Sequence, residues 1–396
     1  MSEKKMPKIR FPEFTGDWKQ RKLEDICKKI TDGSHFSPAE VEDGFPMPSV
    51  KDMTENGFNY DSCKKISAED YEVLVKQGCK PEIGDVLVAK DGSILKYAFE
   101  VKENQDVVIL SSIAILKPNN EMVNGGFLAQ HFMIEDFKKR VIDENTTGTG
   151  VPRIVLTNFK NFMINYPSVD EQKKIAAFFE NIDNLITLHQ RKCNKIKEYK
   201  KGCLQKMFPK DGANVPEVRF PEFTDAWEQR KVSELCSIST GKSNTQDKVE
   251  DGEYPFYVRS PIIERSTKYL YDEEAVLTVG DGVGTGKVFH YVNGKYDLHQ
   301  RCYRMYDFKD ELNAHYFYHT FSKLFYKRVM AMTAKTSVDS VRLEMIADME
   351  IPCPDIKEQE KIGAYFDTLD NLITLHQREC GKYKELKKGL LQQMFV

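Results

Sequence analysis

The chain has 396 residues, which is long enough for two or three domains with separate hydrophobic cores. Its hydrophobic fraction of 40% and charged fraction of 30% are typical of globular proteins, and a net charge of −3 does not by itself indicate a nucleic-acid partner. The most apolar run, Val107–Leu116, is too short to span a membrane. With no signal-peptide pattern and nine scattered cysteines outside zinc-binding spacings, we expect reduced thiols, no metal site and a cytoplasmic location.

Two blocks of the sequence occur twice. RFPEFTGDWKQRKLEDI at Arg10–Ile26 returns as RFPEFTDAWEQRKVSEL at Arg219–Leu235, and Thr149–Pro209 aligns without gaps to Thr336–Val396. The second block contains DNLITLHQR letter for letter in both copies. A repeat of this kind indicates one structural unit built twice. Because the segments between the blocks show little match, we interpret the repeat as a common frame that carries two different recognition domains.

The first intervening segment, Cys27–Gly148, contains two strand-like runs around an Asp-Gly turn at Gly84–Val101, which predicts a hairpin. Polar and basic side chains lie on its expected turns, and such side chains read base edges and hold phosphates. Any one of them is also compatible with ordinary solvated surface. The candidate DNA-binding residues of this half are Ser34, His35, Lys90, Ser93, Lys96, Thr147, Thr149 and Arg153.

The segment Asp170–Phe208 contains no proline and has a heptad pattern, which predicts a helix of about 39 residues, and the repeat predicts a second such helix at the C-terminus. Capping residues at Ser168 and Asp355 mark the two helix starts. We expect the helices to pair with each other, antiparallel. On each helix the predicted core residues form one row with a spacing of seven residues and a second row three residues further along. In the first helix, Phe179, Ile186 and Cys193 broaden this apolar stripe. The predicted core residues of the two rows are Ile175, Ile182, Leu185, His189 and Ile196 in the first helix, and Ile362, Leu369, Leu372, His376 and Leu386 in the second.

His189 and His376 lie at the midpoint of their helices. In an antiparallel pair with pseudo-two-fold symmetry the midpoints meet, so we expect the two imidazoles to lie close together. A polar residue in a helix core lowers stability but fixes the register. The alternative is that each histidine leans out to solvent.

Residues 209–218 contain two prolines and a glycine and are interpreted as a linker. The second intervening segment, Cys236–Lys335, contains a predicted hairpin at Glu274–Val292 with a glycine-rich turn that does not match a phosphate-binding loop. The candidate DNA-binding residues of this half are Lys242, Ser243, Lys287, His299, Gln300, Arg301, Lys335, Ser337 and Arg342.

Catalytic signatures are missing from both halves. The sequence contains no adenine-methyltransferase tetrapeptide and no glycine-rich methyl-donor loop. We therefore predict no catalytic, cofactor or metal site in this chain. A single-chain restriction endonuclease or DNA methyltransferase with an unrecognised active site is the alternative.

The repeated front motif and the blocks YPSVDEQKKIAAFFENIDNLITLHQRK and CPDIKEQEKIGAYFDTLDNLITLHQRE resemble the specificity subunit of type I restriction–modification systems. The stretches TDGSHFSP and YPFYVRS resemble the target-recognition domains of that family. The resemblance covers nearly the whole chain.

The resemblance implies an α+β fold with two mixed α/β target-recognition domains, joined by a pair of long antiparallel coiled-coil helices with a pseudo-two-fold internal repeat. The implied partners are double-stranded DNA with a split site, two methyltransferase subunits and translocating restriction subunits, whereas S-adenosylmethionine, ATP and Mg would belong to those subunits. The domains expected on this basis are 1–166 and 219–353 for recognition, 167–208 and 354–396 for the conserved helices, and 209–218 for the linker.

Overall fold

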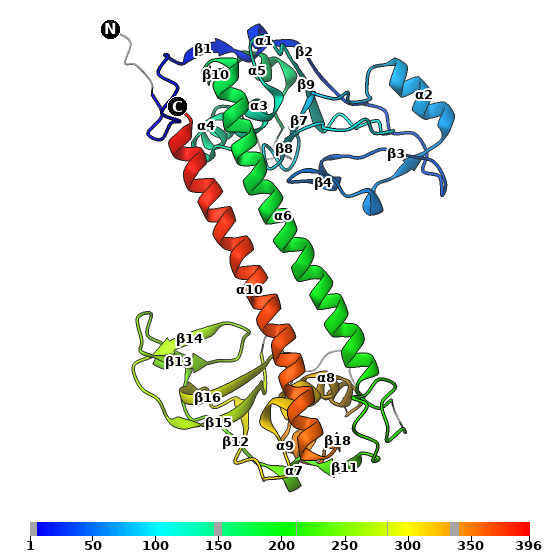
Figure 1. Ribbon diagram of the computed structural model, residues 1–396, viewed down its shortest axis with the longest axis vertical. Coiled ribbons are helices and arrows are strands. Elements are labelled where there is room, and N and C mark those ends of the chain that lie inside the picture. The colour runs from blue at the N-terminus through cyan, green and yellow to red at the C-terminus, as the bar shows by residue number, and fades with distance from the viewer. Residues whose placement is uncertain (1–5, 146–152, 211, 283, 333–339) are drawn as a thin grey trace. The chain divides into compact units, whose positions relative to one another are not determined.

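The computed structural model describes residues 6–145, 153–210, 212–282, 284–332 and 340–396 (Figure 1). The chain forms two compact units. The first unit comprises Met1–Gln190 with Gln377–Val396, and the second comprises Arg191–His376. Each unit therefore contains part of both long helices, α6 (Val169–Lys206) and α10 (Ile356–Met394).

The strands of the first unit are β1 (Lys19–Lys22), β2 (Cys27–Asp32), β3 (Phe45–Pro46), β4 (Met53–Thr54), β5 (Gly57–Phe58), β6 (Lys65–Ile66), β7 (Val86–Ala89), β8 (Ala98–Glu100), β9 (Ile113–Pro118) and β10 (Met163–Tyr166). Its shorter helices are α1 (Leu23–Ile26), α2 (Ala68–Lys76), α3 (Gly125–His131), α4 (Glu135–Asn145) and α5 (Leu156–Asn161), with 3-10 turns η1 (Val50–Asp52) and η2 (Tyr60–Ser62).

The main sheet of the first unit has the order β2-β9-β7-β8. Its central strands are rich in Val, Ile and Leu and are buried on both faces. Because side chains alternate along a strand, Val86 and Val88 pack on one face with Phe127 of α3, whereas Leu87 packs on the other face with Phe99. The sheet therefore lies between two hydrophobic clusters.

The strands of the second unit are β11 (Glu228–Lys231), β12 (Ser237–Thr240), β13 (Tyr254–Tyr257), β14 (Ile263–Ser266), β15 (Tyr271–Val279), β16 (Phe289–Leu298), β17 (Cys302–Tyr306) and β18 (Glu350–Cys353). Its shorter helices are α7 (Val232–Leu235), α8 (Ala314–Met332) and α9 (Leu343–Ala347), with one 3-10 turn, η3 (Thr245–Asp247).

The two units share a strand arrangement. The order β12-β17-β15-β16 of the second unit repeats the order β2-β9-β7-β8 of the first, and the second sheet then continues with β13 and β14. The antiparallel pair β1–β10 has its counterpart in β11–β18, and even the register agrees, because Arg21 faces Ile164 where Arg230 faces Ile351. Both predicted hairpins, β7–β8 and β15–β16, are confirmed. The repeat is therefore a repeat of structure as well as of sequence.

A buried ion pair fixes the start of each long helix. In the first unit, the guanidinium of Arg10 donates to both carboxylate oxygens of Glu171 at 2.7 Å. In the second unit, Arg219 donates to Glu358 at the same distances, and the Trp227 indole also donates to Glu358, at 3.1 Å. The arginines belong to the repeated front motif, so the motif is tied to the first turn of the helix that follows its recognition segment.

The hydrophobic core of each unit is completed by the end of a helix from the other repeat. Phe395, just after α10, packs against Trp18 and Phe127 of the first unit. Its repeat counterpart Phe208, just after α6, packs against Trp227 and Tyr316 of the second unit. Since burying an aromatic side chain contributes several kcal/mol, each repeat depends on the helix end of the other.

Within each unit the two helix segments run antiparallel. In the first unit, Lys387 pairs with Asp183 at 2.6 Å and Cys380 donates to Gln190 at 3.7 Å. In the second unit, the equivalent Lys200 pairs with Asp370 at 2.6 Å. The same ion pair is thus made twice, with the two helices exchanging roles.

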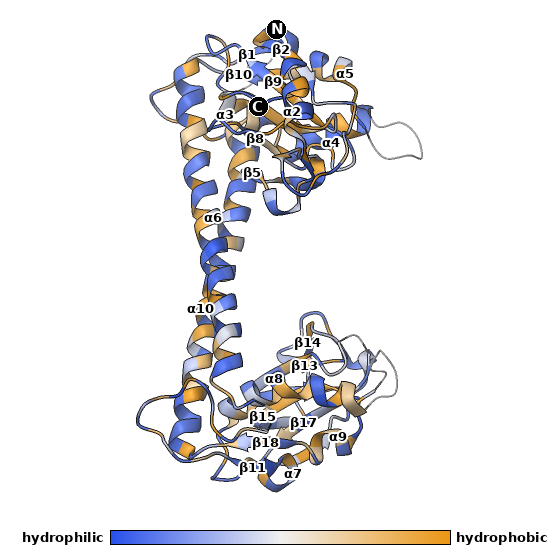
Figure 2. Cartoon of the chain, turned by 90° about the vertical axis from the view of Figure 1, so that its right-hand side faces the viewer, coloured by the Kyte–Doolittle hydropathy of each residue, from blue (hydrophilic) through white to orange (hydrophobic). Residues whose placement is uncertain are grey.

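The structure corrects the predicted helix core in its second row. Leu185, Leu372 and Leu386 are exposed by 37%, 38% and 48%. Ile175, Ile182, Ile362 and Leu369 are buried, whereas His189, Ile196 and His376 are half-buried. The second buried row lies four residues after the first rather than three, and it contains Phe179, Ile186 and Cys193 in α6 and Phe366, Ile373 and Cys380 in α10. Figure 2 shows hydrophobic stretches alternating with hydrophilic ones along both helices.

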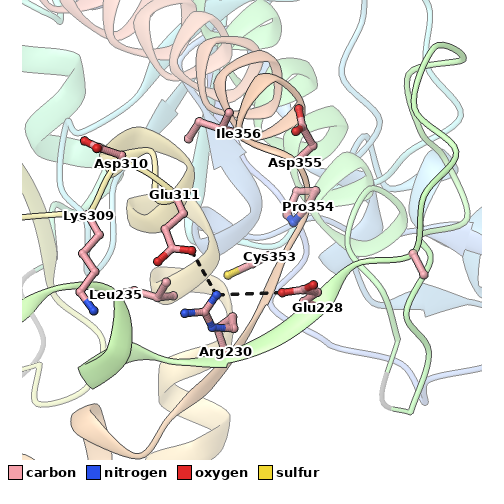
Figure 3. A pocket seen from close by; sticks show the side chains of 11 residues that line it. Glu228, Arg230, Leu235, Lys309, Asp310, Glu311, Cys353, Pro354, Asp355 and Ile356 are labelled. Atoms are coloured by element: carbon pink, nitrogen blue, oxygen red, sulfur yellow. Dashed lines mark hydrogen bonds and ion pairs between the residues drawn. The ribbon is translucent and has the colours of Figure 1, made fainter.

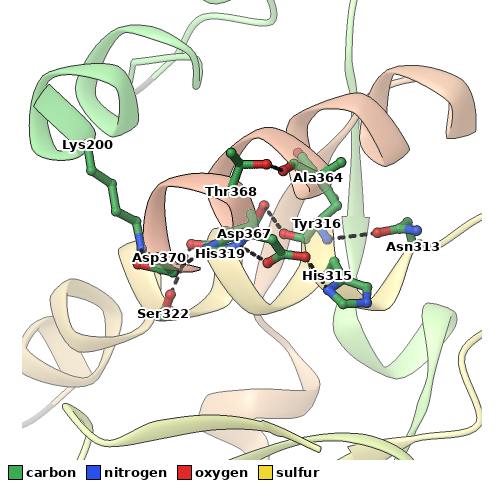
Figure 4. A network of polar contacts seen from close by, with 11 residues as sticks. Lys200, Asn313, His315, Tyr316, His319, Ser322, Ala364, Asp367, Thr368 and Asp370 are labelled. Carbon is green, nitrogen blue, oxygen red and sulfur yellow. Dashed lines mark hydrogen bonds and ion pairs between the residues drawn. The ribbon is translucent and has the colours of Figure 1, made fainter. Parts of the chain in front are cut away.

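A polar network joins α8, α10 and α6 in the second unit (Figure 4). His315 and His319 contact opposite oxygens of Asp367 at 2.5 and 2.8 Å. His319 also lies 3.9 Å from Asp370, which holds Lys200. Burial raises the pKa of Asp367, but the hydrogen bond and charge of His319 and the neighbouring His315 outweigh burial and hold that pKa below its usual value.

We predict that Glu358→Gln destabilises the second unit by roughly 3–5 kcal/mol, because it leaves the Arg219 guanidinium without its buried partner. In a Trp18→Phe background, the fluorescence of Trp227 should report this loss during urea denaturation, since the chain has two tryptophans. Glu360→Gln, an exposed change on the same helix, is the control. Equal midpoints for the two variants would contradict the prediction.

We also predict that Asp367→Asn lowers the melting temperature most at pH values above the ordinary carboxyl pKa of about 4. A lowered pKa in the folded state stabilises the protein above the unfolded-state pKa, and that contribution is lost as the pH falls through the folded-state pKa. Melting curves of wild type and variant should therefore converge between about pH 5 and pH 3. In a His319→Gln background, which removes one of the two imidazoles beside Asp367, the pH-dependent difference should be smaller.

Candidate nucleic-acid interface

In the second unit, the segments that leave β12, β13, β15 and β16 meet in one cluster of loops. Ser243 forms a backbone bridge with His299, whose N–H donates to the Tyr257 carbonyl at 3.0 Å. The Gln300 amide donates to the Asn244 side chain at 2.5 Å. Amide, hydroxyl and guanidinium groups are the groups that recognise base edges and phosphates, so this cluster has the composition of a DNA-reading surface.

Two arginines share one carboxylate in this cluster. Asp281, in the β15–β16 turn, lies 3.4 Å from Arg259 and 3.9 Å from Arg301. Both guanidinium groups remain largely accessible, since the side chains of Arg259 and Arg301 are 47% and 66% exposed. Gly282, which follows the aspartate, has a φ of +94°, a conformation that glycine adopts without strain.

His299 supports the cluster from within. Burial is the main cause that lowers its pKa, followed by the positive charge of Arg259. Its Nδ1 accepts the backbone N–H of Arg301 at 3.0 Å, so a neutral imidazole carries its proton on Nε2, which lies 3.3 Å from the Thr245 hydroxyl. The ring therefore positions Arg301 and Thr245.

The first unit has an equivalent cluster after β2 and β7. Asp91, in the β7–β8 turn, lies 3.3 Å from both Lys90 and Arg153. Asp32, at the end of β2, lies 3.4 Å from Lys90 and 3.3 Å from His35. The sequence after Asp91 is again a glycine with positive φ, Gly92 at +70°.

The remaining predicted residues lie around these clusters. Lys96 is exposed, with its ammonium 5.1 Å from the Tyr97 ring, and Ser93 is half-buried in the same turn. In the second unit, Lys242 and Lys287 are exposed, and Lys287 lies 4.3 Å from the Tyr326 ring.

Arg342 precedes α9, is 57% exposed and pairs with Glu344 at 3.3 Å. Thr147, Thr149, Lys335 and Ser337 lie outside the described residues.

The structure corrects four of the predicted contacts. Ser34, Lys90, Ser243 and His299 are exposed by only 1–5%, so they do not present their side chains to a ligand. Ser34 bonds within its own loop to Phe36, and Ser243 donates to the buried Asp297 at 2.6 Å. Because a buried polar group needs an internal partner, these residues hold the loops in place.

Sequence reasoning missed Arg259, Asn244 and the two turn aspartates. The sequence indicates Asp91 only as part of an Asp-Gly turn and Asp281 only as part of a glycine-rich turn. The available signal was that both aspartates occupy the same place in the repeat, directly after the central strand. Arg259 lies far from Asp281 in sequence, and its place beside it depends on the fold.

A pocket with a volume of about 810 Å³ lies elsewhere in the second unit, where β11 and β18 meet the start of α10 (Figure 3). Arg230 in this pocket is surrounded by Glu228, Glu234 and Glu311 at 3.2–4.0 Å. Its charge is matched from within the protein. Acidic side chains outnumber Arg230 and Lys309 in the pocket lining, so the pocket is poorly suited to a DNA phosphate.

No helix among the described residues is long and apolar enough to cross a membrane. Within those same ranges, no group of three or more His, Cys, Asp or Glu side chains is arranged to hold a metal ion.

A family model described as the type I restriction modification DNA specificity domain matches residues 15–198 and 224–387. The chain belongs to this family. It is 24% identical to the type I restriction enzyme MjaVIII specificity subunit of Methanocaldococcus jannaschii, over 99% of this chain and 95% of the relative. It is 20% identical to the MjaX specificity subunit, described as putative, of the same organism, over 100% and 96%.

Among solved structures, the type I restriction–modification S subunit from M. genitalium matches with a TM-score of 0.73 and 14% identity, covering 99% of both chains. This likeness confirms the fold. Family membership identifies the chain as a DNA-specificity subunit of a type I restriction–modification system, a class whose role is recognition and not catalysis.

For the interface, we predict that alanine variants of Lys96, Arg153, Lys287, Arg301 and Arg342 weaken DNA binding in one of two ways. Loss of a base-reading side chain should cost about 1–3 kcal/mol and relax one position, whereas loss of a phosphate contact should weaken binding to all sequences and reduce the salt slope by about 1. Salt-dependent fluorescence anisotropy on cognate and scrambled duplexes distinguishes these outcomes. Lys231→Ala, on the frame strand β11, is the control, and five variants that behave like the control would exclude this surface.

Proposed function

We propose that this specificity subunit recognises a bipartite double-stranded DNA site, with one unit reading each half-site. The observation that carries the proposal is the combination of a shared frame with different loops. Both units have the same four-strand order and the same turn aspartate, yet Asp91 pairs with the exposed Arg153, whereas Asp281 pairs with the exposed Arg259 and Arg301. Different side chains on one scaffold are suited to different half-site sequences.

The repeated frame is the surface on which we place the partner subunits. The frame comprises the front motifs, the β1–β10 and β11–β18 pairs and the long helices. Two methyltransferase subunits would bind it and would supply S-adenosylmethionine chemistry, while restriction subunits would supply ATP- and Mg-dependent steps. This chain would contribute recognition and scaffolding alone.

We also propose functional boundaries for the repeat. Residues 1–166 and 219–353 would form the recognition domains, with conserved helices at 167–208 and 354–396 and a linker at 209–218. That the helix length sets the spacer between half-sites stays a prediction, as does the proximity of His189 and His376.

The proposal is tested by exchanging residues 27–148 for the equivalent segment of another family member, leaving the frame intact. Because the exchanged segment carries the loop cluster of the first unit apart from Arg153, and none of the cluster of the second unit, we predict that one half-site changes and the other is retained. The measurement is methylation-sensitive sequencing of the host genome with the chimera and its methyltransferase partner expressed. A reciprocal exchange of residues 236–335 is the matched control, and should change the opposite half-site. A folded, assembled chimera that alters both half-sites would rule out one unit per half-site.

A further inference from the structure

The turn aspartates Asp91 and Asp281 occupy the same place in the two units. Each is the second residue after the central strand, β7 or β15, and each precedes a glycine with positive φ. Each also forms a backbone bridge to the segment that leads into the last short helix of its unit, through Arg153 in one case and Ser340 in the other. The other residues of the two turns differ. The aspartate is therefore associated with this position in the fold rather than with a particular loop sequence.

Each aspartate pairs with two cations that come from different parts of the chain. Asp91 has Lys90 beside it in the turn and Arg153 from the segment before α5. Asp281 has Arg259 from the β13–β14 loop and Arg301 from the β16–β17 loop. The unit that lacks a lysine in the turn, with Gly280 in its place, thus uses a second arginine from elsewhere.

The three ion pairs made by arginine are long and open to solvent, whereas Lys90 is buried beside Asp91. The separations are 3.3–3.9 Å, and the Arg153, Arg259 and Arg301 side chains are about half exposed or more. Solvent-exposed pairs of this kind are weak. A DNA phosphate or a guanine edge can therefore replace the carboxylate as the partner of a guanidinium, without a large energetic barrier.

We propose that Asp91 and Asp281 are specificity-determining residues, which neutralise and orient the exposed arginines of their unit, Arg153 in the first and Arg259 and Arg301 in the second, until the correct half-site is bound. This inference rests on the proposed DNA-reading function. Each carboxylate lowers the attraction of its cations for phosphates of any sequence. It also fixes the exposed guanidinium groups beside it in one orientation, so that only bases matching that orientation displace it.

The test uses Asp91→Asn and Asp281→Asn in the full chain assembled with its methyltransferase subunits. Each variant keeps the side-chain shape but removes the charge that holds Arg153 in the first unit, or Arg259 and Arg301 in the second. Each freed cation that reaches a phosphate should steepen the slope of log K against log salt by about 0.9, which corresponds to about eightfold tighter non-specific binding at about 0.1 M salt. Binding to a scrambled duplex is measured over a salt series, and half-site choice is measured by genome methylation sequencing.

The expected result is a steeper salt slope for both variants together with relaxed base choice confined to one half-site each. The two variants are controls for one another, because Asp91→Asn should leave the half-site of the second unit unchanged. Asp348→Asn is a matched charge control: it releases Lys231, at 3.3 Å, on the frame of the second unit. In the double variant Arg259→Ala with Asp281→Asn, the salt slope should return toward that of the wild type.

Three outcomes would overturn the inference. The first is an unchanged salt slope and half-site choice in both variants. The second is an equal gain in non-specific binding for Asp348→Asn, which would reduce the effect to bulk charge. The third is a loss of cognate binding with no gain on scrambled DNA, which would make the aspartates direct readers of a base. A wild-type chain that shows no half-site preference would instead refute the proposed function itself.

Discussion

The buried carboxylates of Glu171 and Glu358 hold the frame of each unit together. Each accepts two hydrogen bonds from one arginine of the front motif, and each lies in the first turn of a long helix. The next residue of each helix is a buried glutamine, Gln172 or Gln359, whose side-chain oxygen accepts the backbone N–H of an N-cap asparagine of α3 or α8. Three segments distant in sequence are therefore fixed at one point.

The geometry of this Arg–Glu contact explains why the two repeats match in sequence at their ends and differ in their middle segments. A bidentate Arg–Glu pair tolerates little displacement, because an unpaired buried charge costs several kcal/mol. The exposed side chains of the recognition loops are subject to no such constraint. The loops leave the ends of strands whose own packing is set by Val, Ile and Leu side chains, so the turn residues can change without disturbing the frame.

Much of this organisation could be predicted from the sequence, because repeats, heptads and Asp-Gly turns are local or self-similar signals. The predicted second core row of the long helices was wrong by one position, for a physical reason. Phe178 and Phe179, or Leu185 and Ile186, are adjacent apolar residues, and a period of 3.6 allows either to face the core. Which one is buried depends on the neighbouring elements, which the heptad does not specify.

The candidate site was less predictable, because its residues are paired through the fold. The sequence around Lys90 is typical of an exposed lysine in a turn. In the structure Lys90 is buried, because an ion pair with Asp32 on another strand offsets the cost of burying its charge. Arg259 is brought to Asp281 by the parallel pairing of β13 with β16 and the antiparallel hairpin of β15 with β16. No periodicity in the sequence predicts this contact between Arg259 and Asp281.

The low net charge of the chain is consistent with its function as a specificity subunit. A strongly basic surface binds any DNA, because counterion release from phosphates is independent of sequence. A reader must instead gain affinity chiefly at base edges, so that the correct site is distinguished from a large excess of others. Cations that are paired with carboxylates in the same loop cluster satisfy that requirement. The carboxylate offsets their attraction for phosphates, and they bind DNA strongly only where a DNA group replaces the carboxylate. A net charge near zero is therefore compatible with sequence-specific DNA recognition by both units.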